Sequence, residues 1–194
     1  MSTVNYSTLD LIGREIESAK TKRNFFSKII QDYKKKRPVL LRVHVPAKLF
    51  CRIKDLTESL EDKEFEFEIN DVFAMIAKDI LSAYNERIDG ETLRRGLLSL
   101  EGKVVKRYGE SEEFMKDFVK DAIPVTVSLE YAVARELEWI AHDMHEIAKD
   151  DDRVLSVEDM LRITFIDLSK KIQNGQIPDL RRRLVKFVKT GKTA

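Results

Sequence analysis

Residues 39–53 read VLLRVHVPAKLFCRI, and the spacing of their apolar side chains changes at Pro46. From Leu41 up to the proline, apolar and polar residues alternate, as they do in a half-buried strand. After the proline, which suits the first turn of a helix, apolar residues recur at helical spacing. The stretch therefore predicts a strand over 39–45 and a helix over about 47–60.

This arrangement occurs twice in the chain. A charged stretch follows the helix, and a second amphipathic helix is predicted over about 69–86. Each element has a counterpart 84 or 88 residues later: a strand over 123–129, a helix over about 130–148 and a helix over 157–173. Compared apolar positions stay apolar except at the pair Ile76 and Thr164. Chance matching of amphipathic patterns is the alternative, because period matching is permissive.

A lone short strand would leave its backbone donors and acceptors without partners. We therefore expect strand 39–45 to pair antiparallel with strand 123–129 across a pseudo-twofold axis, giving a mainly helical fold with one two-stranded ribbon. The side chains expected to face the helices are Leu41, Val43, Val45, Val125, Val127 and Leu129. Those expected to face outward are Leu40, Arg42, His44, Pro124, Thr126 and Ser128.

Two pairs of segments resemble ribbon-helix-helix DNA-binding motifs of the MetJ/Arc type. They are RVHVPAKLFCRI with INDVFAMIAKDI, and TVSLEYAVAREL with SVEDMLRITFIDL. Members of that family usually dimerise to build their ribbon, whereas here both motifs lie in one chain. Such a tandem form is similar to transcription regulators of archaeal viruses. The resemblance covers about half of the chain and is mostly a hydrophobic pattern.

The resemblance implies a non-enzymatic transcription regulator that binds double-stranded DNA sequence-specifically with its ribbon in the major groove. The outward residues Leu40, Arg42, His44, Pro124, Thr126 and Ser128 would contact bases. Arg42 can donate two hydrogen bonds to guanine, and His44 can donate or accept one. The alternative for Arg42 and His44 is an exposed strand face without a partner, or one covered by another part of the chain.

Family members hold phosphates at the N-terminus of the second helix, where free N–H groups favour anions. Ser156 fits this role, but Glu68 occupies the matching position of the first motif and would repel phosphate. Two basic runs are further candidates, with solvated helix ends as the alternative. The expected phosphate contacts are Lys34, Lys35, Lys36, Arg37, Ser156, Arg181, Arg182 and Arg183.

The remaining segments are predicted to be helical. A helix over 7–35, capped by Ser7 or Thr8, ends in the basic run, and a short basic helix runs from Asp179 to Thr190. The expected divisions of the chain are 1–37, 38–87, 88–121 (a helical connector), 122–174 and 175–194.

Charge is distributed unevenly although the net charge is only +1. Residues 14–54 hold 13 Lys and Arg against 3 Asp and Glu, residues 170–194 hold 8 against 1, and residues 55–169 hold 14 against 29. Basic ends favour a polyanion partner. An acidic centre between them would also allow head-to-tail self-association, which makes filaments when it does not close.

Several classes of protein are disfavoured by composition. The first residues are polar and no apolar run is long enough to span a bilayer, so we expect no membrane partner and an intracellular location, the host cytoplasm if the protein is viral. The single cysteine excludes an internal disulfide. Only 8 Asn and Gln residues occur, a weak sign of a hot environment.

No motif of an enzyme is present, and we expect no catalytic residues and no cofactor. His142 and His145 have a spacing that can bind metal, but no third histidine is near, so no metal site is expected. Cys51 is expected to be a core residue. The competing functions are a helical protein–protein adaptor and a nonspecific nucleic-acid packaging protein.

Overall fold

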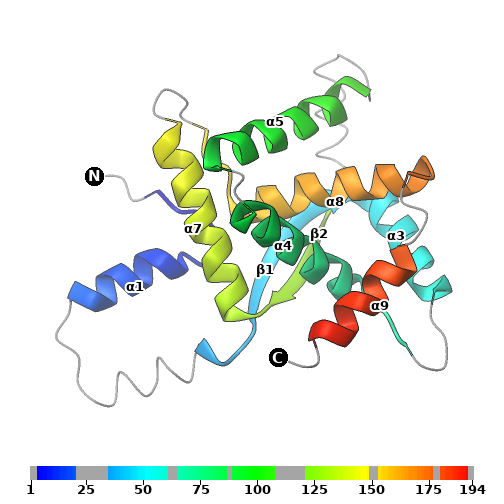
Figure 1. Ribbon diagram of the computed structural model, residues 1–194, viewed down its shortest axis with the longest axis horizontal. Helices are drawn as coiled ribbons and strands as arrows, with labels where there is room; N and C mark the ends of the chain where they lie inside the picture. The colour runs from blue at the N-terminus through cyan, green and yellow to red at the C-terminus, as the bar shows by residue number, and fades with distance from the viewer. Residues whose placement is uncertain are drawn as a thin grey trace.

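The computed structural model describes residues 4–20, 35–60, 65–86, 89–107, 121–148, 153–176 and 180–191. These residues form seven helices and one two-stranded antiparallel sheet, which confirms the predicted mainly α fold (Figure 1). The elements are α1 (Leu11–Lys20), β1 (Val39–Pro46), α3 (Ala47–Ser59), α4 (Ile69–Asn85), α5 (Gly90–Arg107), β2 (Ala122–Leu129), α7 (Tyr131–Ile147), α8 (Val157–Gln173) and α9 (Leu180–Gly191).

The strands β1 and β2 pair antiparallel along their whole length, from Val39 opposite Leu129 to Pro46 opposite Ala122. The pairing of the two strands was predicted, and each strand is one residue longer than expected. Pro46 ends β1 and directly precedes the first residue of α3. We call the pair β1–β2 the ribbon.

One face of the ribbon belongs to the hydrophobic core, as the alternation predicts. All six side chains expected to face the helices are at most 7% exposed: Leu41, Val43, Val45, Val125, Val127 and Leu129. Helix α8 packs against β1, and α4 packs against β2. The second helix of each strand–helix–helix unit therefore lies on the strand of the other unit, so neither unit buries its strand without the other.

The two units match in the order of their elements and in the positions where their helices begin. Helices α3 and α7 begin 84 residues apart, and α4 and α8 begin and end 88 residues apart. The rings of Phe73 in α4 and Phe165 in α8 stack with centroids 4.9 Å apart. Buried residues of both units form a single hydrophobic cluster, which also includes Leu11, Leu97 and Leu184 from the flanking helices.

The N-terminal helix differs from the prediction. It begins at Leu11 rather than at residue 7, because the Ser7 hydroxyl accepts the N–H groups of Leu9 and Asp10 in a turn, and Asp10 has a positive φ of 49°. The helix is described as far as Lys20, and the rest of the predicted span, up to residue 34, lies outside the described residues.

Two further predictions of burial were wrong. Cys51 is exposed, because it lies two residues from both Leu49 and Ile53 and so points away from the face that these two residues bury. The apolar spacing of the predicted helix over about 130–148 places Ile147 on the same inward face as Leu137 and Ile140, but Ile147 is 48% exposed because it is the last residue of α7.

Helices α5 and α9 are additions to the two units. Helix α5 packs against α7 and α8, and α9 packs against α4 with Leu180 and Leu184 buried. In Figure 1, α5 and α9 lie on different sides of α8. The remainder of the predicted connector, residues 108–120, lies outside the described residues. Within the described ranges, no helix is long and apolar enough to cross a membrane.

Candidate nucleic-acid interface

The face of the ribbon turned away from the helices carries the side chains predicted to contact bases. Leu40 is 59% exposed, and Arg42 and His44 are exposed beside it on β1. On β2, Pro124 and Thr126 are exposed. Ser128 is half-buried. The prediction that this row faces outward is therefore confirmed for five residues, and Ser128 lies at its margin.

The position of Ser128 is fixed by a side chain of the first unit. The amide of Asn70, at the start of α4, accepts the backbone N–H of Ser128 at 2.8 Å and donates to its carbonyl oxygen at 3.2 Å. The backbone of β2 is thus tied to α4 on the side where it has no strand partner. Periodicity did not indicate this contact, since Asn70 reads as an ordinary polar residue of a helix start.

The register places the centre of the ribbon at one residue pair. Arg42 lies opposite Thr126, and these two residues are also equivalents under the 84-residue shift of the repeat. The pseudo-twofold axis therefore passes through the pair Arg42–Thr126. On one side of it Leu40 faces Ser128, and on the other side His44 faces Pro124.

The outward row has dimensions that suit a major groove. Leu40, Arg42 and His44 span about 13 Å along β1, which is about four base-pair steps. The groove is about 12 Å wide and admits a two-stranded ribbon. Among the described residues, no carboxylate forms an ion pair with Arg42, so its guanidinium is available to a partner.

Cations flank β1 at both ends. Lys36 and Arg37 are exposed just before the strand begins, and Lys48 is exposed two residues after it ends. Lys48 was missed by the prediction although it directly follows the strand signal. The ends of β2 carry exposed carboxylates instead, at Asp121 and Glu130. The positive charge at the ends of the ribbon is consequently supplied from the β1 side.

Lys35 is held by a cluster around Glu15 of α1. The Glu15 carboxylate lies 3.3 Å from Lys35 Nζ, 2.7 Å from Arg135 Nε and 3.0 Å from the Tyr131 hydroxyl, which donates to it. Burial alone would raise the pKa of Glu15, but these hydrogen bonds outweigh it and hold the pKa below its ordinary value. Burial, followed by the bond to Glu15, raises the pKa of Tyr131 to about 12. The predicted contact Lys34 lies outside the described residues.

The N-terminus of α8, where Ser156 was expected to hold phosphate, is covered by the N-terminal segment. The Ser156 hydroxyl accepts the N–H of Asp159 at 3.1 Å, and the N–H of Val157 donates to the Tyr6 carbonyl at 2.8 Å. The carboxylate of Glu158 accepts two hydrogen bonds from Thr8. Several donors of this helix end are therefore occupied, and phosphate binding by Ser156 stays a prediction.

The N-terminus of α4 is also satisfied from within the chain. The N–H of Glu68 donates to the Asp71 carboxylate at 2.9 Å. This agrees with the expectation that the first unit departs from the phosphate-binding pattern at Glu68. Carboxylates lie at the N-termini of both α4 and α8. The contacts at these two helix ends, among the described residues, therefore include no counterpart of the symmetric phosphate binding that the ribbon-helix-helix resemblance implies.

The C-terminal arginines contact the first unit. Arg183 pairs with Asp79 of α4 at 2.6 Å, and Arg181 Nε donates to the carbonyl of Leu60 at 3.3 Å. Arg182 is exposed. Arg183 thus helps to hold α9 against α4, and Arg181 ties α9 to the end of α3. A role of all three arginines in phosphate binding remains a prediction.

The two histidines of α7 lie in an aromatic cluster. The ring of His142 makes edge contacts with Tyr6 and Trp139, with centroids 5.3 Å and 5.5 Å away, and the ring of His145 lies 6.1 Å from Tyr6. Within the described ranges, no group of three or more metal-binding side chains gathers around them. Their contacts therefore serve to hold the N-terminal segment on α7.

Comparison with known proteins gives no guide to the family: no family model, curated protein or solved structure was found to match this chain.

Proposed function

We propose that this protein is a sequence-specific DNA-binding transcription regulator built as two ribbon-helix-helix motifs in one chain. The observation that supports this most is the ribbon itself, whose register centres on Arg42 and Thr126. One face of the ribbon is buried by α4 and α8, and the other presents five exposed side chains to solvent. Such a ribbon fits the major groove, where each base pair has its own pattern of donors and acceptors.

Arg42 is the residue expected to contribute most to base recognition. A bidentate contact from arginine to guanine O6 and N7 discriminates against the wrong base by about 1–3 kcal/mol. The central position of Arg42 lets the flanking side chains Leu40 and His44 reach base pairs on either side of that guanine. Lys36, Arg37 and Lys48 lie beside the ends of β1, where they can approach phosphates.

The two halves of the outward face are chemically different, which bears on the target sequence. Under the repeat, Leu40 corresponds to Pro124, Arg42 to Thr126 and His44 to Ser128. A symmetric dimer reads a palindrome because both halves present the same side chains. This chain is therefore expected to prefer a DNA site without twofold symmetry, in which Arg42 contacts a guanine that has no symmetry-related counterpart.

The test compares Arg42→Ala with Lys186→Ala, which removes the same charge from an exposed position on α9. Affinities are measured for the preferred sequence and for random DNA. Arg42→Ala should weaken preferred binding by about 1–3 kcal/mol, or about 5- to 150-fold, with little effect on random DNA. Lys186→Ala should affect both DNAs similarly. Equal losses on both DNAs in Arg42→Ala would reject base recognition by this residue.

A protein–protein adaptor is the second candidate, and one observation favours it. Leu40 exposes 59% of its surface at one end of the outward row of β1, and Pro124 is a second exposed apolar residue on the same face, so a protein partner docked there would bury apolar surface. An adaptor predicts that Arg42→Ala leaves DNA binding unchanged and that Leu40→Ser abolishes binding to the protein partner.

A further inference from the structure

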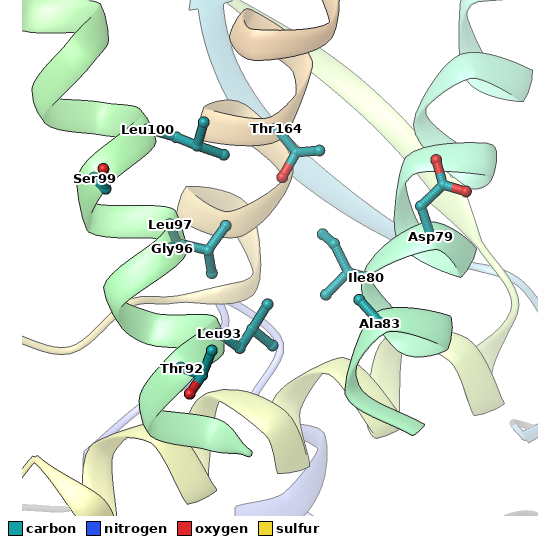
Figure 2. A pocket seen from close by; sticks show the side chains of 10 residues that line it. All are labelled: Asp79, Ile80, Ala83, Thr92, Leu93, Gly96, Leu97, Ser99, Leu100 and Thr164. Carbon is teal, nitrogen blue, oxygen red and sulfur yellow. The ribbon is translucent and has the colours of Figure 1, made fainter. Parts of the chain in front are cut away.

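A cavity of about 490 Å³ lies between α4, α5 and α8, outside the ribbon (Figure 2). Its wall is mainly aliphatic. Ile80 and Ala83 come from α4, and Leu93, Leu97 and Leu100 come from α5. In Figure 2 the three leucines project from one helix toward the space that Ile80 borders from the other side. Small-molecule sites typically have about 300–1,000 Å³, so the size suits such a ligand.

Gly96 keeps one wall of the cavity open. It lies in the middle of α5, where glycine destabilises a helix relative to alanine. A Cβ atom placed on Gly96 would have no heavy atom within 4 Å, so no close packing requires a glycine at this position. The glycine therefore leaves space beside Leu93 and Leu97 at a cost in helix stability.

Thr164 marks a second departure from the pattern of the core. In the first unit the equivalent residue is Ile76, which is 1% exposed. In the second unit Thr164 is half-buried and lines the cavity from α8. The exchange removes apolar volume and adds a hydroxyl, which can donate or accept one hydrogen bond.

The lining also indicates the charge of the ligand. Of the ten described lining residues, Asp79 alone is charged, and its carboxylate pairs with Arg183 at 2.6 Å. The cavity thus offers aliphatic contact and hydroxyl groups, but no uncompensated charge. A charged ligand would lose part of its hydration there without gaining a counterion.

We propose that this cavity binds a neutral, mainly apolar small molecule that carries one hydrogen-bonding group, with Thr164 as the polar contact. A protein partner is less suited to it, because a stable interface uses about 20–30 residues a side, two to three times the ten described residues that line this cavity. The site is separate from the ribbon and does not depend on the proposed DNA binding.

The test uses N-phenyl-1-naphthylamine, a neutral fluorophore that brightens in apolar surroundings, with the full chain and no DNA. Gly96→Leu fills the cavity, and Gly96→Ala is the matched control because it changes the same backbone position without filling the space. We expect saturable binding at one site. Gly96→Leu should weaken that binding by about tenfold or more, and Gly96→Ala should leave it within about twofold.

Circular dichroism and the urea midpoint establish whether each variant is folded. If Gly96→Leu does not fold, Ala83→Leu replaces it in the test, because Ala83 lies on the opposite wall of the cavity. Absence of saturable fluorescence overturns the proposal, as does equal weakening by the leucine and alanine variants. Self-association in sedimentation that disappears in Gly96→Leu also overturns the small-molecule proposal, because the occupant of the cavity would then be a second copy of the chain. Because no DNA is used, failure here leaves the proposed function to its own test.

Discussion

Replacing the carboxylate of Glu138 is expected to release the N-terminal segment from α7. Glu138 is only 1% exposed, although it lies on a helix whose other acidic residues are mostly at the surface. Its carboxylate accepts the backbone N–H of Leu11 at 3.0 Å, the N–H of Ile12 at 2.8 Å and the hydroxyl of Ser7. It therefore caps α1 from a different helix.

The size of the effect follows from these contacts. A hydrogen bond to a charged group contributes about 1.5–3 kcal/mol, and loss of a helix cap costs about 0.5–2 kcal/mol. Adding these contributions gives an upper limit for the loss of stability. The N-terminal segment can detach from α7 in the variant, and water then solvates the donors that Glu138 bound. The measured loss is then the free energy of docking the segment, and we expect about 2–4 kcal/mol for Glu138→Ala.

Urea denaturation and amide hydrogen exchange over Leu11–Lys20 measure this loss. Glu136→Ala is the matched control, since Glu136 is exposed two residues earlier on the same helix. It should change stability by no more than about 0.5 kcal/mol. If Glu138→Ala and Glu136→Ala gave the same midpoint and the same exchange rates in α1, the role assigned to the buried carboxylate would be wrong.

Three further predictions concern the hydrogen bonds between Asn70 and the ribbon, the stability of the protein in acid, and self-association. Asn70→Ala removes both hydrogen bonds to the backbone of Ser128 and should lower the free energy of unfolding by about 1–3 kcal/mol, whereas Asn85→Ala, at the exposed end of α4, should be near neutral in the same urea titration. The pKa of Glu15 is lowered in the folded protein, so its contribution to stability is complete above the ordinary pKa of 4.5 and is lost as the pH falls through the lowered value. Glu15→Gln should therefore be less stable than the wild type near neutral pH, and the two proteins should converge in acid; a constant difference at all pH values would contradict this. Head-to-tail association of basic ends with the acidic centre predicts sedimentation coefficients that rise with concentration at low salt and fall when salt is added, and a concentration-independent monomer at low salt would exclude it.

Much of the fold could be predicted because both units follow simple periodicities. The alternation around Val43 and Val125 set the strands and their buried face, and the helix over 157–173 has the bounds that its apolar spacing indicated. The antiparallel pairing followed from the need of each strand for a partner. The outward direction of Arg42 and His44 then required no further information.

The polar contacts between remote segments could not be predicted in this way. Glu138 accepts the backbone N–H of Leu11, and Asn70 accepts that of Ser128. Neither contact can be inferred from the spacing of apolar residues. The cover over α8 depends on the Tyr6 carbonyl, a backbone atom that no side-chain pattern reveals. Cys51 shows the limit of the pattern itself, because a residue between two core positions of a helix can point to solvent.

The central claim is that the ribbon reads a DNA sequence, and selection of bound sequences from a random duplex pool at physiological salt tests it most directly. We predict enrichment of one motif without twofold symmetry, containing a guanine whose preference disappears when the selection is repeated with Arg42→Ala. Recovery of an unenriched pool by the wild-type protein would contradict the claim.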